Sequence, residues 1–288
     1  MRRSAVLAAA AAAAVVAGAV AAATARARRG RRLPVRTAAV KPKSRNRALH
    51  NRSRAEDRFP GMPARIAPLP RTVLLAGATG LVGRALLQRL LEHPQTQHVH
   101  VLLRRAASAI AAHPKLELHV VDFAHLRRLP RVDDVYIALG TTIKVAGSQE
   151  AFRQVDHDHV IAIARAAREA GAKRLAVVSA LGADRGSRVF YNRVKGEMEA
   201  DAAALGYEEV CFAQPSLLLG DRAALGQPTR PGEVWASRLL GPVLPLVPRG
   251  IRPIAAEDVA AALLAATLAG KPGVHRLASA RMQGAQRR

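Results

Sequence analysis

A short apolar segment, three regularly spaced glycines and a helical pattern follow one another directly, and this succession limits the folds open to the chain. Residues 72–76, Thr-Val-Leu-Leu-Ala, have the length of a buried strand, and Gly77, Gly80 and Gly83 come next. Residues 84–92 then repeat leucine at helical spacing. The sequence therefore predicts a strand, a glycine turn and a helix.

Each glycine of this turn suits a phosphate site. The first would permit a sharp turn off the strand, the second a close approach of the backbone to a pyrophosphate, and the third close packing of the helix on the sheet. The helix N terminus would add free N–H groups and the positive end of its dipole. The spacing is G-x-x-G-x-x-G, and a purely structural turn is the alternative. The expected contacts are Gly77, Thr79, Gly80, Leu81, Val82 and Gly83.

A second predicted strand, residues 98–103, ends in Arg104 and Arg105. An NAD-specific protein usually has an acidic residue there to bind the ribose hydroxyls, whereas an arginine fork suits a 2′-phosphate. The pair therefore favours NADP(H), with NAD(H) as the alternative. Two arginines that merely end an exposed strand would be the structural explanation.

Strand and helix patterns continue to alternate, with strands expected at 116–121, 133–139 and 174–180 and a helix at 149–170. Such alternation predicts an α/β fold, a Rossmann-like doubly wound parallel sheet with a small C-terminal substrate-side region. Ligands of such sheets bind outside the carboxyl ends of the strands. Further cofactor contacts are therefore expected at or after these ends and after a sixth predicted strand, residues 210–213. They are Asp122, Phe123, Leu139, Gly140, Thr141 and Pro215.

Three residues with acid–base or hydrogen-bonding side chains follow the fifth strand. Ser179 stands at its end, and Tyr191 and Lys195 are four residues apart, which places them on one face of a helix. A nearby ammonium lowers the pKa of a phenol, so Tyr191 could exchange a proton with a carbonyl or alcohol oxygen. Ser179 could donate a hydrogen bond to the same oxygen. The structural alternatives are a serine that caps a turn and a half-buried surface pair.

With these motifs the body of the chain, from about residue 73 to 280, resembles the short-chain dehydrogenase/reductase superfamily in its extended or atypical branch. It is most similar there to the NAD(P)H-binding group of the Tat-interacting protein and its bacterial relatives. The resemblance implies that Ser179, Tyr191 and Lys195 form the active site and that the lysine also contacts the nicotinamide ribose. Many extended members have Asn where Asp156 stands, and some relatives are regulators. The matching segments are residues 77–83, 121–123, 139–142, 155–156, 191–199, 214–222 and 230–233.

Most of the excess positive charge lies in front of this body. Residues 1–71 contain 17 Lys and Arg against 2 Asp and Glu, a net +15, while the whole chain has a net charge of +24. We expect an Ala-rich apolar leader at 1–25, a disordered basic linker at 26–70, the NAD(P)-binding domain at 71–280 and a basic tail at 281–288. Aromatic residues make up only 3%, which argues against a specific nucleic-acid reader.

The leader permits three interpretations. Its apolar run, residues 5–25, could be a targeting presequence or extension, a membrane anchor that leaves the body in the cytoplasm, or an export signal. The positive charge after the run favours a cytoplasmic body, and the Arg-rich, acid-poor start equally fits an organelle transit peptide. The sequence gives no oligomeric state.

Other candidate residues have simpler explanations. Cys211 lies in an apolar run and is expected to be inert core, and Trp235 is expected to pack. The pairs His98/His100 and His157/His159 lack further ligands in the sequence, so no metal site is expected.

These features make an NADP(H)-dependent oxidoreductase for a small carbonyl, alcohol or sugar-like substrate the leading hypothesis. The alternatives are an NADP(H)-binding regulator or assembly protein with little turnover and a sugar-nucleotide epimerase or dehydratase. The apolar segment 239–247 suits a lid or pocket wall, with ordinary packing as its alternative.

Overall fold

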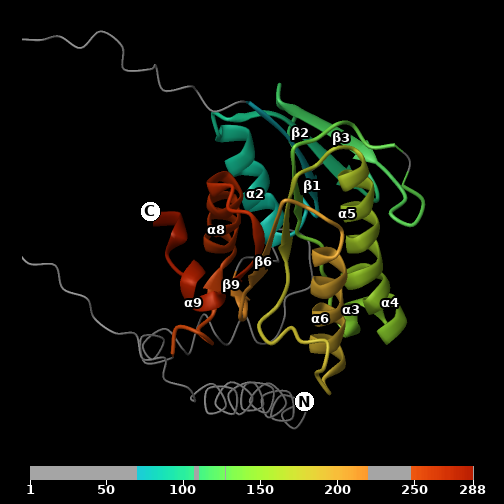
Figure 1. The fold of residues 1–288 in the computed structure, drawn as a ribbon, viewed down its shortest axis with the longest axis vertical. Coiled ribbons are helices and arrows are strands. Elements are labelled where there is room, and N and C mark those ends of the chain that lie inside the picture. Colours follow the sequence, from blue (N-terminus) through green and yellow to red (C-terminus); the bar gives the residue numbers. More distant parts are fainter. Residues whose placement is uncertain (1–69, 107–109, 127, 220–247, 288) are drawn as a thin grey trace, which may run out of the picture. The chain divides into compact units, whose positions relative to one another are not determined.

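The strand β1 (Arg71–Ala76), which precedes the glycine turn, lies in a seven-stranded parallel sheet (Figure 1). The structure is a computed structural model that describes residues 70–106, 110–126, 128–219 and 248–287. The sheet has the order β3-β2-β1-β4-β5-β6-β9. Its other strands are β2 (Thr96–Leu103), β3 (Leu116–Val120), β4 (Asp134–Ile137), β5 (Arg174–Val178), β6 (Glu209–Gln214) and β9 (Gly273–Ala278). The predicted Rossmann-like parallel sheet is confirmed.

Helices cover both faces of this sheet. The helix α2 (Leu81–Glu92) packs with α8 (Ala256–Ala269) on one face, while α5 (His159–Glu169) and α6 (Phe190–Ala203) cover the other (Figure 1). This division follows from the side chains of β1, which point alternately to the two faces of the sheet. Val73 and Leu75 join the core under α2 and α8. Leu74 and Ala76 join the core under α5 and α6.

The helix expected at 149–170 is present but contains one wide turn. It runs through α4 (Gln149–Arg153), the π-type turn η1 (Gln154–Asp158) and α5. Such turns often occur at functional sites, and this one contains the buried Asp156.

Short elements complete the described chain. They are α3 (Ile143–Ala146), the two-stranded pair β7 (Leu218–Leu219) and β8 (Ile254–Ala255), α9 (Ser279–Met282) and η4 (Ala285–Arg287). The expected boundary at residue 280 falls inside α9, where Met282 is fully buried. The side chain of Asp258 accepts hydrogen bonds from the backbone N–H groups of Gly284 and Gln286, so these residues pack on α8.

Several expectations fall outside the described residues. These are the leader and linker up to residue 69, the motif residues 220–222 and 230–233, Trp235 and the segment 239–247. In the described ranges, no helix combines the length and apolar character needed to cross a bilayer. Cys211 is fully buried in β6, and burial raises the pKa of its thiol to about 12.

Candidate active site

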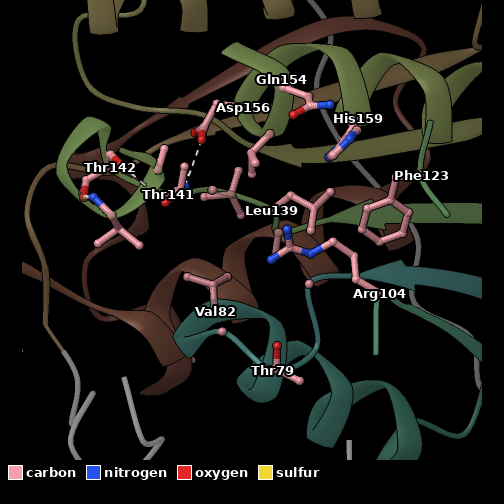
Figure 2. Close-up of a pocket in the computed structure, with 18 of the residues that line it drawn as sticks. Thr79, Val82, Arg104, Phe123, Leu139, Thr141, Thr142, Gln154, Asp156 and His159 are labelled. Carbon is pink, nitrogen blue, oxygen red and sulfur yellow. Dashed lines mark hydrogen bonds between the residues drawn. The ribbon is translucent and has the colours of Figure 1, made fainter. Parts of the chain in front are cut away.

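A cavity of about 620 Å³ lies at the carboxyl ends of β1, β2, β4 and β5. On one side it is bounded by the start of α2, with Thr79 and Val82, and on the other by the α4–η1–α5 segment, with Gln154, Asp156 and His159 (Figure 2). From β1 the chain adds β2 and β3 on one side of the sheet and then β4 on the other side of β1. Doubly wound sheets bind ligands at this switch point.

Most of the residues predicted for the site line this one cavity. These residues are spread over more than 100 positions, from Gly77 to Lys195, and the parallel sheet brings them together. They are Gly77, Thr79, Gly80, Leu81, Val82, Arg104, Phe123, Leu139, Gly140, Thr141, Ser179, Tyr191 and Lys195.

Two glycines of the turn are required by the chain's own packing. A Cβ on Gly83 would lie 1.9 Å from the carbonyl oxygen of Gly77, and one on Gly77, which has a φ of 91°, would lie 2.6 Å from the backbone of Ala138. A Cβ on Gly80 would meet nothing closer than 3.4 Å. The chain itself therefore leaves room for a side chain at Gly80, and the space above it belongs to the cavity.

Four predicted contacts, Gly83, Arg105, Asp122 and Pro215, do not line the cavity. Gly83 packs under the turn as described above. Arg105 is exposed after β2. The carboxylate of Asp122 accepts a hydrogen bond from the backbone of Ala124 and pairs with His125, and Pro215 accepts one from the backbone of Leu181.

Lys195 is held by a buried carboxylate. Its Nζ lies 2.8 Å from Oδ1 of Asp156, and Oδ2 accepts a hydrogen bond from the backbone N–H of Thr141 over 2.8 Å. Burial lowers the pKa of Lys195, but Asp156, followed by Tyr191 and Glu199, raises it more, so the pKa lies above its ordinary value. Lys195 therefore remains an ammonium at neutral pH.

Tyr191 lies one helical turn before Lys195 on α6 and lines the same cavity. Its ring packs against Phe152 of α4, with ring centroids 5.3 Å apart. The buried Phe152 therefore positions the phenol ring.

Ser179 is tied to a second buried carboxylate. Its Oγ donates to Oε1 of Glu199 over 2.6 Å, and Glu199 also accepts hydrogen bonds from Gln214 and Arg276. The residue after β5 and residues of β6 and β9 thus meet α6 at Glu199, which is only 2% exposed.

The far end of the cavity contains Arg104, Phe123 and His159, and the Arg104 side chain points into it (Figure 2). The rings of Phe123 and His159 meet edge to face at 5.6 Å. Burial, followed by the positive charge of Arg104, lowers the pKa of His159. Its Nδ1 is buried and has no hydrogen-bond partner within the described part of the chain.

The sequence did not place Gln154, His159 or Glu199 in this site, and His159 appeared only as a candidate metal ligand. The first two lie around the wide turn, which no periodicity indicates. Glu199 reaches Ser179 across 20 residues and Arg276 across 77, so only the fold reveals the cluster. The segment 191–199 resembles the family pattern, but that resemblance assigns no role to Glu199.

A family model described as NAD(P)H-binding matches residues 77–209. The mitochondrial protein fmp52 of Aspergillus fumigatus is 38% identical over 206 residues, which cover 69% of this chain and 86% of the relative. The mitochondrial protein FMP52 of Eremothecium gossypii is 38% identical over 150 residues, covering 52% of this chain and 67% of the relative.

Solved structures share the fold. The ADP-L-glycero-D-manno-heptose-6-epimerase of Helicobacter pylori has a TM-score of 0.54 at 19% identity, covering 73% of this chain and 77% of that one. DesIV, a dTDP-glucose 4,6-dehydratase of Streptomyces venezuelae with bound NAD, has a TM-score of 0.55 at 16% identity, covering 71% and 74%.

Proposed function

The chain belongs to the fmp52 family of NAD(P)H-binding proteins, and we propose that it is an NADP(H)-dependent oxidoreductase acting on a small carbonyl, alcohol or sugar-like molecule. The observation that carries this proposal is the position of Tyr191. Its phenol lines the same cavity as the glycine turn, together with the ammonium of Lys195. A nucleotide site and a proton-transfer pair thus share one space.

The cavity fits a dinucleotide. A Cβ would be tolerated at Gly80 by the chain but would occupy cavity space, as expected where a pyrophosphate approaches. The first turn of α2 has no acidic residue, which favours an anion at its N terminus. Nδ1 of His159, which has no hydrogen-bond partner among the described residues, offers a hydrogen-bonding group at the other end of the cavity. Gly77, Gly80 and the start of α2 would hold the phosphates, and Lys195 would contact the nicotinamide ribose.

Arg104 supports a preference for the 2′-phosphate. It follows β2 and lines the cavity, whereas its neighbour Arg105 does not. A guanidinium fork binds phosphate through paired, charge-assisted hydrogen bonds. We therefore assign the NADPH preference to Arg104 alone.

When bound, the nicotinamide would supply or accept the hydride. The chain's own task is to manage the proton. Tyr191 would hold it at Oη and transfer it to or from the substrate oxygen. Lys195 keeps a positive charge near that phenol, and the Asp156 carboxylate fixes its position. Ser179 would bind the same oxygen, but its only hydroxyl proton is donated to Glu199 in this arrangement. It can therefore accept a hydrogen bond from an alcohol, or donate one after rotating.

The experiment is NADPH consumption across a panel of aldehydes and ketones, measured beside NADPH affinity. Tight binding together with consumption that requires a panel member is the expected result. Tight binding without consumption would support the alternative, an NADP(H)-binding protein with little turnover. The Ser179–Glu199 hydrogen bond is the observation that favours this alternative. Absence of binding would contradict both.

We also propose that the leader is a targeting presequence. Its Arg-rich, acid-poor composition supports this, and the names of the fmp52 relatives give a mitochondrial location for those proteins. A chain that begins at Pro63 should bind NADPH as the full chain does, because β1 begins at Arg71. A soluble truncated protein that fails to bind would contradict a dispensable leader.

A further inference from the structure

A second cluster of ionisable side chains lies on the edge of the sheet and does not line the cofactor cavity. In the parallel register of β2 and β3, His100 pairs with Glu117, and Leu102 pairs with His119. Because alternate residues of a strand share a face, His100, Glu117 and His119 project on the same side of the sheet. The sequence suggested His98 and His100 without a further ligand, and the neighbouring strand supplies two.

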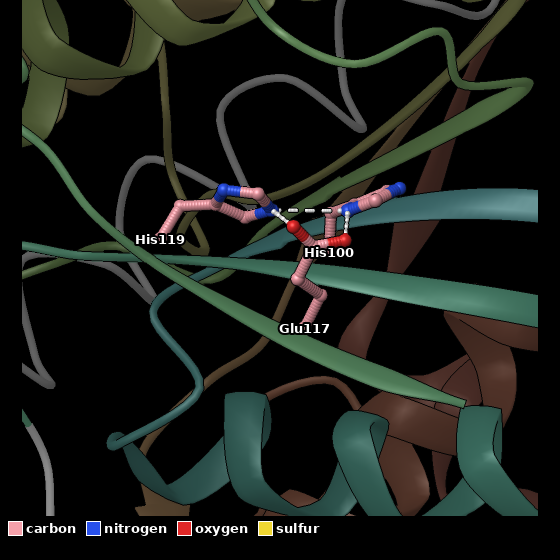
Figure 3. Close-up of side chains that lie close together, drawn as sticks. All are labelled: His100, Glu117 and His119. Atoms are coloured by element: carbon pink, nitrogen blue, oxygen red, sulfur yellow. Dashed lines mark hydrogen bonds and ion pairs between the residues drawn. The ribbon is translucent and has the colours of Figure 1, made fainter. Parts of the chain in front are cut away.

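The three side chains converge on one point. Nδ1 of His100 lies 3.0 Å from Nε2 of His119, and the Glu117 carboxylate lies 3.3 Å from the first and 3.6 Å from the second of these nitrogens. Figure 3 shows the two imidazoles facing each other with the carboxylate beside the gap. Ligand atoms about 2.0–2.1 Å from a tetrahedral zinc ion lie about 3.3 Å from one another. The observed separations of 3.0–3.6 Å bracket that spacing, with Oε2 of Glu117 facing His100 and Oε1 facing His119.

The geometry points to a divalent transition-metal site formed by His100, Glu117 and His119, and we propose that it binds Zn²⁺. Two imidazoles and one carboxylate are a typical zinc donor set that leaves one position for water. Mg²⁺ and Ca²⁺ prefer sites made of oxygen ligands and would bind poorly.

The surroundings of the cluster suit an ion that enters from solvent. The side chains of His100 and His119 are 12% and 26% exposed, so packing on the sheet holds them, while Glu117 is 65% exposed. A bound ion would join β3 to β2 through side chains from both strands. β3 lies at the sheet edge, with Val120 61% exposed, so the ion would stabilise a strand that pairs on one side only.

The test is Zn²⁺ binding by the full chain after removal of metals, measured by competition with a chromophoric chelator. Three single variants are compared with wild type, namely His119→Ala, Glu117→Gln and the matched control His125→Ala. His125 is an exposed histidine that also pairs with a carboxylate, Asp122, at 2.9 Å. NADPH affinity verifies that each variant is folded.

We expect wild type and His125→Ala to bind one Zn²⁺ equally well and to bind Mg²⁺ poorly. The two cluster variants should lose at least about tenfold in Zn²⁺ affinity, since removing even an outer partner of a metal ligand costs about 10–100-fold. Co²⁺ should give an intense tetrahedral absorption spectrum in wild type that both cluster variants lack. Equal Zn²⁺ affinity in wild type and Glu117→Gln would overturn the proposal and leave a hydrogen-bonded histidine pair.

Discussion

The hydroxyl of Ser179 donates its only proton to Oε1 of Glu199, 2.6 Å away, at the wall of the candidate active site. Glu199 keeps two other hydrogen-bond donors, Gln214 and Arg276, and is buried. Its carboxylate therefore stays satisfied if Ser179 rotates toward a substrate. The Ser179 hydroxyl can therefore donate to Glu199 when no substrate is bound and to the substrate oxygen after rotating.

If Ser179 binds the reacting oxygen, Ser179→Ala should slow hydride transfer by about 10²–10³-fold, the usual cost of losing one such donor. NADPH affinity should change little, because the glycine turn and Arg104 are untouched. Ser179→Thr keeps a hydroxyl and should recover part of the rate. A wild-type rate in Ser179→Ala, with lowered thermal stability, would reduce Ser179 to a structural link to Glu199.

Alanine at two positions of the glycine turn should cause two different defects, one in NADPH binding and one in stability. Gly80→Ala should fold normally, since its Cβ meets nothing closer than 3.4 Å, but should weaken NADPH binding by filling cavity space. Gly83→Ala places a Cβ 1.9 Å from the Gly77 oxygen and should lower the melting temperature. Thermal unfolding and NADPH titration of both variants test this. Unchanged NADPH affinity in a folded Gly80→Ala would contradict the phosphate site.

The preference for NADPH over NADH can be tested at two neighbouring arginines, Arg104 and Arg105. Arg104→Ala should weaken NADPH binding by about 10–100-fold, which corresponds to the loss of a charged hydrogen bond worth about 1.5–3 kcal/mol. NADH affinity should change little, because NADH lacks the 2′-phosphate. Arg105→Ala is the control and should keep the wild-type ratio of NADPH to NADH affinity. Equal ratios in all three proteins would remove the assignment.

The buried pair of Lys195 and Asp156 predicts a dependence of stability on pH. Because the pKa of Lys195 is raised above 10.5 in the folded protein, the pair stabilises fully below pH 10.5 and less as pH rises through the higher folded value. Asp156→Asn should lower the free energy of unfolding by about 3–5 kcal/mol at neutral pH, since it leaves a buried ammonium unpaired.

A double variant tests whether that loss comes from the charge. Asp156→Asn with Lys195→Met removes both charges and should recover most of the stability in denaturant unfolding at pH 7. The deficit of Asp156→Asn alone should shrink at strongly alkaline pH. A double variant as unstable as Asp156→Asn would show that packing, and not the ion pair, causes the defect.

The sequence predicted the parts of the site that follow strand ends. Gly77, Gly140 and Ser179 directly follow apolar strands, and their shared edge follows from parallel pairing. It could not separate Arg104 from Arg105, because that depends on which side chain turns into the cavity. Nor could it locate Glu199, whose partners lie directly after β5 and on β6 and β9.

The irregular turn η1 was equally hidden from the sequence. Residues 149–170 read as one regular helix, and nothing in their spacing indicates the wide turn around Asp156. In the sequence, Asp156 stands out only because many proteins that the chain resembles have Asn at this position. The structure shows what the carboxylate does, since an Asn could not balance the Lys195 charge.

The most direct test of the proposed chemistry is single-turnover NADPH oxidation by wild type and Tyr191→Phe, with a carbonyl substrate from the panel. The variant keeps the ring that packs on Phe152 and loses the hydroxyl group that carries the transferable proton. We predict that the rate falls by about 10²–10⁴-fold, the scale of a positioned acid–base group, while NADPH affinity and melting temperature stay near wild type. Hydride transfer at the wild-type rate in Tyr191→Phe would contradict the mechanism.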